Sequence, residues 1–310
     1  MTQTNAAGSS GTTATPGTPA PRHGIAYSET GSGPTLVLIH GVCHSRHAWD
    51  DVVPYLADDF RVITIDLPGH GESPDPDPMD EGVVDRIIGD IANFLRDVTP
   101  GPGDAAAGPG DAAAGPGDAA AGPDAAPSLV GKPHVAGNSL GGYVALELAR
   151  RGHAASATAL NPAGFFHGPG DQKRTVNQFL ALRGTGRAFR KMIPFLSRTA
   201  AGRTFMFGMF SSKPWRLNPD NVIRDAGNLL RNKVIDHGLR AKFDFSPDTA
   251  GARQTCYWGT RDLTLYRGWK RHFAVLPDVP LHLLPNLGHV PMLDDPRTVA
   301  EAIRRGTGLG

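Results

Sequence analysis

Several short segments of the chain are apolar almost without interruption, and this feature restricts the possible folds more than any other. TLVLIH (35–40) and RVITIDL (61–67) lack the strict alternation of a strand with one solvated face. Continuous apolar runs of this length are typical of strands buried on both faces of a parallel sheet. Further strands of this kind are predicted at PHVAG (133–137), ASATALNPA (155–163), RQTCYWG (253–259) and PLHLLPN (280–286).

Helical segments alternate with these strands. Apolar residues recur at helical spacing in VVDRIIGDIANFLRDV (83–98) and again over 140–151, and a terminal helix is expected to begin near Pro296. Strands that alternate with helices predict an α/β fold with a mostly parallel sheet and helices on both faces. A chain of 310 residues is long enough for one large domain of this kind that carries a sizeable insertion.

Shifts in composition predict how the chain is organised. Residues 1–22 lack the basic and apolar regions of a signal peptide and are predicted to be a disordered tail. Three copies of GPGDAAA within 100–127 contain no branched apolar residue, so this stretch is predicted to be a disordered insertion rather than a coiled coil. Residues 164–250 are predicted to form a helical cap, inserted into a core made of residues 23–163 and 251–310.

The predicted cap differs in composition from the rest of the chain. It holds 10 of the 13 phenylalanines and has 15 Lys and Arg residues against 6 Asp and Glu residues. Most of the phenylalanines are expected to form the cap's own core, and some to line an apolar pocket. The basic excess is expected to be a solvated face rather than an anion-binding surface.

The balance of charge and the cysteine content disfavour several classes of protein. The whole chain has 31 Lys and Arg residues against 30 Asp and Glu residues, which gives no global bias toward nucleic acid or acidic membranes. Cys43 and Cys256 form neither a disulfide framework nor a metal-binding CxxC pair. No run of about 18 apolar residues occurs, so no membrane span is expected. These features predict a soluble, cytoplasmic protein, and they leave its oligomeric state open.

A serine lies at the tightest predicted turn of the chain. GNSLG (137–141) has the form G-x-S-x-G and stands between a predicted strand and a predicted helix. In that setting, a strained turn lifts the serine hydroxyl off the sheet, and the glycines let strand and helix approach each other. The backbone N–H of Leu140, at the start of the helix, points toward the same place. Ser139 is therefore the candidate nucleophile.

A serine nucleophile needs a base, and the base needs an acid that orients it. His289 follows the last predicted strand directly, and Asp262 follows the strand before it. Both would lie with the serine at the carboxyl edge of a parallel sheet. Asp294 and Asp295 are expected to cap the last helix instead, and Asn161, at an alternative position for the acid, carries no charge.

The turn after the first predicted strand supplies a second donor for an oxyanion. The N–H of Val42 in HGVCHSRHAW can face the same pocket as the Leu140 N–H. His40, His44 and His47 have a spacing that also suggests a metal site. With no helix and no carboxylate or thiol partner nearby, this alternative is disfavoured, and neither a metal nor an organic cofactor is expected.

The segments HGVCHSRHAW, DLPGHGESPDP, GNSLGG, WGTRD and LGHVPMLDDP occur in an order that resembles the α/β-hydrolase superfamily, over residues 35–300. The resemblance is to its cap-bearing serine esterase and haloperoxidase-like branch. It implies a mostly parallel eight-stranded sheet flanked by helices, with an inserted helical cap. It also implies a catalytic triad of Ser139, Asp262 and His289. The implied oxyanion donors are Val42 and Leu140.

Two departures narrow the functions that the resemblance implies. The turn after His40 lacks the extra glycines and prolines of C–C hydrolases, and a serine nucleophile argues against dehalogenase and epoxide hydrolase chemistry. The leading hypothesis is a carboxylesterase-like serine hydrolase acting on a small, largely apolar ester. A C–C bond hydrolase, acyltransferase or perhydrolase that uses the same triad remains an alternative, as does a non-catalytic ligand receptor on the same fold.

Overall fold

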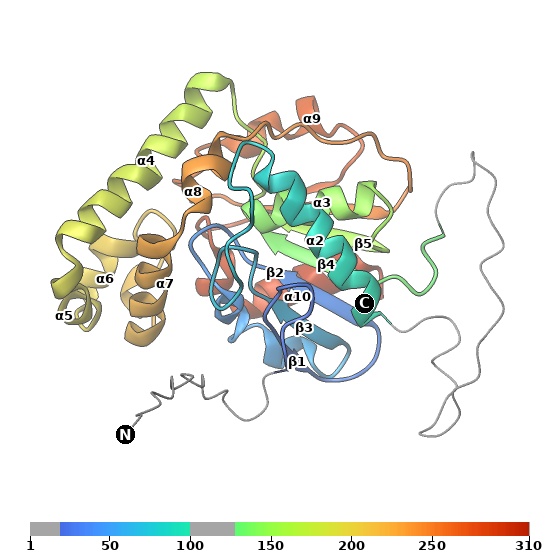
Figure 1. The fold of residues 1–310 in the computed structure, drawn as a ribbon, viewed down its shortest axis with the longest axis horizontal. Helices are drawn as coiled ribbons and strands as arrows, with labels where there is room; N and C mark the ends of the chain where they lie inside the picture. Colours follow the sequence, from blue (N-terminus) through green and yellow to red (C-terminus); the bar gives the residue numbers. More distant parts are fainter. Residues whose placement is uncertain (1–18, 100–127, 310) are drawn as a thin grey trace, which may run out of the picture.

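A computed structural model describes residues 19–99 and 128–309 of the chain. The sheet in these residues runs in the order β1-β3-β2-β4-β5-β6-β7, with β1 antiparallel to β3 and all other pairs parallel (Figure 1). Its strands are β1 (Tyr27–Thr30), β2 (Thr35–Ile39), β3 (Arg61–Ile65), β4 (His134–Asn138), β5 (Ser156–Leu160), β6 (Arg253–Gly259) and β7 (Leu281–Leu284). The predicted α/β class is confirmed.

The expected number of eight strands is wrong, because the described residues form seven. Immediately before β1, Arg22 and Ile25 exchange both backbone hydrogen bonds, at 3.1 and 2.8 Å. The two residues between them, His23 and Gly24, have φ angles of 49° and 72°, which make a tight turn. The chain therefore folds back on itself here instead of extending as a further edge strand.

Helices flank the sheet on both faces. The connections through α2 (Val83–Val98) and α3 (Leu140–Arg150) advance toward one edge of the sheet, whereas the connection through α1 (Val53–Leu56) advances toward the other. Because parallel crossovers are right-handed, α1 lies on the opposite face from α2 and α3. The terminal helix α10 (Pro296–Thr307) packs beside α1. Strands β2 and β5, between these layers, are buried along their whole length.

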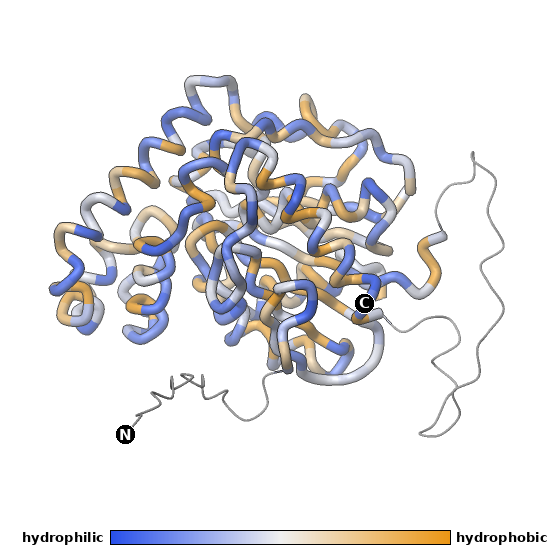
Figure 2. The backbone as a smooth tube through the Cα atoms, viewed as in Figure 1, coloured by the Kyte–Doolittle hydropathy of each residue, from blue (hydrophilic) through white to orange (hydrophobic). Residues whose placement is uncertain are grey.

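A group of helices connects β5 to β6. Figure 1 shows α4, α5, α6 and α7 together at one end of the molecule beside the sheet. The helices between the two strands are α4 (Pro169–Ala188), α5 (Ile193–Ser197), α6 (Ala200–Phe207), α7 (Pro219–Arg231) and α8 (Val234–His237). Figure 2 shows hydrophobic and hydrophilic stretches alternating along α4. These helices fall within the predicted cap of residues 164–250, and the division into core and cap stays a prediction.

Short helical turns complete the fold. Near the C-terminus, α9 (His272–Val275) precedes β7. The 3-10 turns are η1 (Arg46–Trp49), η3 (Arg190–Met192), η4 (Pro214–Arg216), η5 (Gly238–Arg240), η6 (Gly268–Arg271) and η7 (Pro291–Leu293). Among the described helices, none is long and apolar enough to cross a membrane. The predicted insertion at 100–127, and the predicted tail apart from residues 19–22, lie outside the described residues.

Candidate active site

Ser139 occupies the junction between β4 and α3. Its φ of 54° and ψ of −115° are unusual for a residue other than glycine, and such strain is found at functional turns. Two backbone hydrogen bonds hold the conformation: the Ser139 N–H donates to the Leu160 carbonyl at 2.9 Å, and the Tyr143 N–H donates to the Ser139 carbonyl at 3.1 Å. The turn is therefore anchored to the neighbouring strand and to its own helix.

The glycines around Ser139 are required by close backbone contacts. A Cβ atom on Gly137 would lie 2.0 Å from the Gly141 carbonyl oxygen. One on Gly141 would lie 2.3 Å from the Ile39 carbonyl oxygen at the end of β2. Strand β4, helix α3 and strand β2 can therefore meet at this turn only if both positions lack a side chain.

The structure brings the three predicted catalytic residues together. His289 Nε2 lies 3.0 Å from Ser139 Oγ, and His289 Nδ1 lies 2.9 Å from Asp262 Oδ2. All three side chains are buried. The other oxygen of Asp262 accepts hydrogen bonds from the backbone N–H groups of Thr264 and Leu265, both at 2.9 Å.

This arrangement selects a histidine tautomer. A carboxylate can only accept a hydrogen bond, so the proton between Asp262 and His289 belongs to Nδ1. In neutral His289, Nε2 is then free to accept the hydrogen of the Ser139 hydroxyl. Proton transfer from Ser139 to His289 is chemically possible in this geometry, and the catalytic roles of the three residues stay predictions.

The two predicted oxyanion donors flank Ser139. Leu140 is the first residue of α3, where backbone N–H groups have no partner within the helix. Val42 follows Gly41, and a Cβ atom on Gly41 would lie only 3.0 Å from the Ser139 Cβ. The turn that carries Val42 thus passes directly against the serine. A role for either N–H in binding an oxyanion stays a prediction.

His40 stabilises the backbone of this turn through two hydrogen bonds. Its Nε2 accepts a hydrogen bond from the Leu67 N–H at 3.0 Å, so its Nδ1 carries the proton and donates to the Gly41 carbonyl at 2.7 Å. Complete burial holds the pKa of His40 well below its ordinary value, which keeps the ring neutral and this hydrogen-bond pattern intact.

The three histidines that suggested a metal site do not share one. Both ring nitrogens of His40 form hydrogen bonds with backbone groups. The His44 ring lies 3.1 Å from the buried carboxylate of Asp225, and His47 lies 3.0 Å from Asp50 at the surface. No cluster of His, Cys, Asp or Glu suited to a metal ion occurs within residues 19–99 and 128–309.

Two buried asparagines hold the loop that carries His289, and the sequence analysis missed this role. The side-chain amides of Asn138 and Asn161 both donate to the His289 carbonyl, at 2.8 and 2.7 Å. Asn161 also donates to the Gly288 carbonyl at 2.8 Å and accepts from the Gly259 N–H at 2.6 Å. One signal in the sequence could have indicated this role: each asparagine is a polar residue at the end of an apolar strand, which places it at the carboxyl edge of the sheet.

The two aspartates before α10 differ in role. Asp295 caps the helix, as predicted, by accepting from the Thr298 N–H at 3.1 Å. The same prediction for Asp294 is wrong. Its carboxylate turns the other way and accepts from the backbone N–H groups of Gly288 at 2.6 Å and Ser212 at 2.9 Å. Asp294 thereby joins the His289 loop to the chain after α6.

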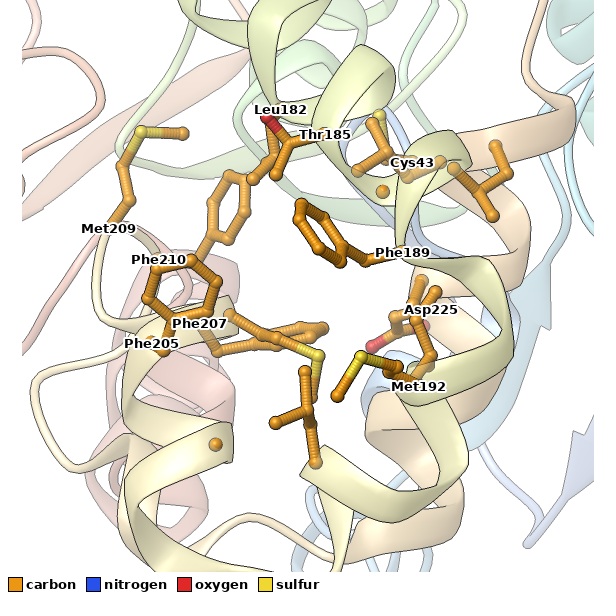
Figure 3. Close-up of a pocket in the computed structure, with 18 of the residues that line it drawn as sticks. Cys43, Leu182, Thr185, Phe189, Met192, Phe205, Phe207, Met209, Phe210 and Asp225 are labelled. Atoms are coloured by element: carbon orange, nitrogen blue, oxygen red, sulfur yellow. The ribbon is translucent and has the colours of Figure 1, made fainter.

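A cavity of about 800 Å³ lies among α4, α5, α6 and α7 (Figure 3). Its inner wall includes Cys43 and His44, which follow the Val42 turn, and Phe210. The Phe210 carbonyl accepts a hydrogen bond from the Val290 N–H at 2.9 Å, so this wall also adjoins the His289 loop. The lining is mostly apolar and includes four of the ten phenylalanines of residues 164–250, namely Phe189, Phe205, Phe207 and Phe210.

Several curated proteins are similar to parts of this chain. A pimeloyl-[acyl-carrier protein] methyl ester esterase from Methylococcus capsulatus is 33% identical over 139 residues, which are 44% of this chain and 40% of that protein. The corresponding esterase from Nitrosomonas europaea is 45% identical over 70 residues, 21% of this chain and 28% of that protein. The chain thus matches less than half the length of these relatives. An uncharacterized protein from Mycobacterium tuberculosis is 23% identical over 301 residues, 90% of this chain and 77% of that one.

Solved structures share the fold. A bacterial membrane phospholipase A superposes with a TM-score of 0.62 at 22% identity, covering 92% of this chain and 84% of that one. An esterase from Thermogutta terrifontis superposes with a TM-score of 0.58 at 22% identity, covering 91% and 92%. The profile of the alpha/beta hydrolase family matches residues 36–302, which include strands β3 to β7 and all of β2 except its first residue. The chain therefore belongs to the alpha/beta hydrolase family.

Proposed function

We propose that the protein is a serine hydrolase that cleaves a carboxylic ester of a small, largely apolar substrate. The observation that carries this proposal is the unbroken hydrogen-bond chain from Ser139 through His289 to Asp262. None of these three residues lines the apolar cavity, which approaches them through Cys43, His44 and Phe210. The names of the two methyl ester esterases that match part of the chain support an ester as the substrate.

The proposed reaction proceeds by acyl transfer. His289 accepts the Ser139 proton as the serine oxygen attacks the ester carbonyl, while Asp262 stabilises the protonated ring. The Val42 and Leu140 N–H groups stabilise the oxyanion. His289 then donates its proton to the leaving alcohol, and a water molecule repeats the attack on the acyl-enzyme to release the acid.

The helices between β5 and β6 provide the binding walls in this proposal. We assign residues 164–250 as a cap that covers the site and separates the substrate from water. The mostly apolar lining favours an apolar acyl or aromatic group over a charged one. The pair of His44 and Asp225 is a polar exception on the cavity wall.

Labelling with a fluorophosphonate and turnover of p-nitrophenyl esters test the proposal. The wild-type protein should react with both reagents, and Ser139→Ala should abolish labelling and lower kcat by about 10⁶ while the protein stays folded. Ser156→Ala is a matched control, since Ser156 Oγ also lies close to a histidine, 2.8 Å from His134 Nδ1. It should keep both activities. Full turnover by Ser139→Ala would exclude this serine as the nucleophile.

A further inference from the structure

The helices around the cavity carry an uneven charge. Residues 172–219 include ten Lys and Arg residues and no Asp or Glu. Of these cations, Arg190, Lys191 and Arg198 are exposed, and their side chains have no hydrogen bond or ion pair with any described residue. Their charges therefore face solvent without an anion to balance them.

Large apolar side chains are exposed in the same place. Phe189, Met192, Phe195 and Phe205 are 53%, 46%, 66% and 73% exposed. They come from the end of α4 and from η3, α5 and α6, and all except Phe195 also line the cavity (Figure 3). The cavity therefore reaches the surface among them. We name these four residues, together with Arg190, Lys191 and Arg198, the cavity rim.

A solvated basic face does not account for the rim, because such a face would not expose four large apolar side chains on elements that contact one another. Aromatic side chains next to Lys and Arg are typical of surfaces that enter the headgroup layer of a membrane. There the cations contact anionic headgroups while the rings contact acyl chains. We infer that the cavity rim docks on a membrane surface that contains anionic lipid.

The charge of the rim also argues against a second copy of the chain as the occupant. In a two-fold dimer the same surface patch meets itself, so the unpaired cations of one copy would face those of the other. An anionic lipid surface instead neutralises these charges. It also offers a route for substrate, since an apolar ester dissolved in lipid would enter the cavity without crossing water. Only this route for an ester substrate rests on the proposed function.

Vesicle flotation of the full-length Ser139→Ala protein tests docking without turnover. Vesicles of phosphatidylcholine mixed with phosphatidylglycerol should bind the protein, and vesicles of phosphatidylcholine alone should bind it much less. Phe195 does not line the cavity, so Phe195→Ser leaves the lining unchanged. This substitution should weaken vesicle binding about tenfold. Arg190→Glu combined with Lys191→Glu should weaken it about 25-fold or more, at about fivefold for each lost cation.

Matched controls come from surfaces away from the rim. Phe273→Ser removes an aromatic ring that is 65% exposed on α9, and Arg297→Glu reverses an exposed charge on α10. Both should leave binding unchanged. The rim variants, made with Ser139 intact, should hydrolyse a water-soluble ester at the wild-type rate.

Three results would overturn the inference. One is the absence of binding to both kinds of vesicle by a protein that still hydrolyses a soluble ester. Another is a solution dimer that Phe195→Ser dissociates, with no vesicle binding. The third is vesicle binding that depends on Arg190 and Lys191 but not on Phe195, which would indicate charge attraction alone and no docking of the apolar side chains in the lipid. Vesicle binding by a protein without esterase activity would instead overturn the proposed function and leave the docking surface intact.

Discussion

The carboxylate of Asp262 makes a different contact with each of its oxygens, and this division predicts the effect of Asp262→Asn. An asparagine keeps an oxygen toward the N–H groups of Thr264 and Leu265 only by turning its NH₂ group toward His289 Nδ1. His289 would then carry its proton on Nε2 and could not accept one from Ser139. We expect kcat for a p-nitrophenyl ester to fall by about 10⁴.

The control for this substitution is Asp295→Asn. Asparagine caps a helix as well as aspartate does, so both kcat and the melting temperature should be unchanged. A near-wild-type rate for Asp262→Asn would mean that another residue is the acid.

Asn161 acts on the site through the backbone of the His289 loop. Asn161→Ala would leave the buried Gly259 N–H and Gly288 carbonyl without partners, at about 1–3 kcal/mol for each group. We expect the free energy of unfolding, measured with urea, to fall by about 3 kcal/mol.

The kinetic effect of Asn161→Ala distinguishes a role of Asn161 in positioning His289 from a role in the stability of the fold alone. Because His289 does not contact the substrate's apolar group in the proposed reaction, kcat should fall about tenfold or more while KM changes little. A folded Asn161→Ala protein with wild-type kcat would show that the asparagine serves stability alone.

At the scale of elements, the strand–turn–helix unit of β4 and α3 depends on its glycines. Gly137→Ala would place a Cβ atom 2.0 Å from the Gly141 carbonyl oxygen, and backbone cannot yield by that amount cheaply. We expect a loss of about 3 kcal/mol or more in the free energy of unfolding, or failure to fold. The matched control is Gly89→Ala in α2, where nothing lies within 4 Å of the added atom.

The control substitution, Gly89→Ala, should increase the free energy of unfolding. Gly89 is exposed within a helix, where alanine is favoured over glycine by about 0.5–1 kcal/mol. Thermal unfolding of the two variants measures both effects. A stable, active Gly137→Ala protein would contradict the close packing of β4 against α3.

The elements differ in how far their sequences predict them. Helix α2 was predicted at its observed bounds, since its apolar residues follow one helical face over four turns. The apolar runs predicted six strands, and five of them are buried on both faces, whereas β7 is half exposed. The edge strand β1, with sequence YSET, was missed because only one of its residues is fully buried. A polar edge strand has no periodic signal of its own.

At the scale of the whole molecule, buried histidines predict sensitivity to acid. Burial lowers the pKa of His70 to about 4, and it holds the pKa of His40 well below its ordinary value. In the unfolded chain both side chains would titrate near 6.5. Below that pH the unfolded state therefore binds protons that the folded state does not bind, and stability decreases as the pH falls from about 6.5 toward 4.

Urea unfolding at several pH values measures this effect. Each of the two histidines should contribute a slope of up to about 1.4 kcal/mol per pH unit between pH 6 and 5. His70→Gln should reduce the slope by about that amount. An unchanged slope in this variant would contradict the assignment of His70 as a buried, neutral group.

The candidate site was more predictable than its surroundings. Ser139, Asp262 and His289 each follow a recognisable strand, and parallel strands bring their carboxyl ends to one edge. The cavity could not be predicted in the same way. It depends on how α4, α5, α6 and α7 pack against one another, and α4 has no single apolar face from which a partner could be inferred. Nor does the sequence indicate that Asp294 turns away from the helix it precedes.

The place where the inserted helices join the sheet has a consequence for how such a protein can diversify. Strands β5 and β6 are parallel, hydrogen-bonded neighbours, so the insertion leaves the sheet at the carboxyl end of β5 and re-enters it at the amino end of β6, on the opposite edge. Exchanging that segment for one of another length costs little closure entropy and disturbs no strand register. If the proposed function holds, substrate preference can therefore be altered through this segment, provided that Phe210 and Ser212 keep their hydrogen bonds to Val290 and Asp294.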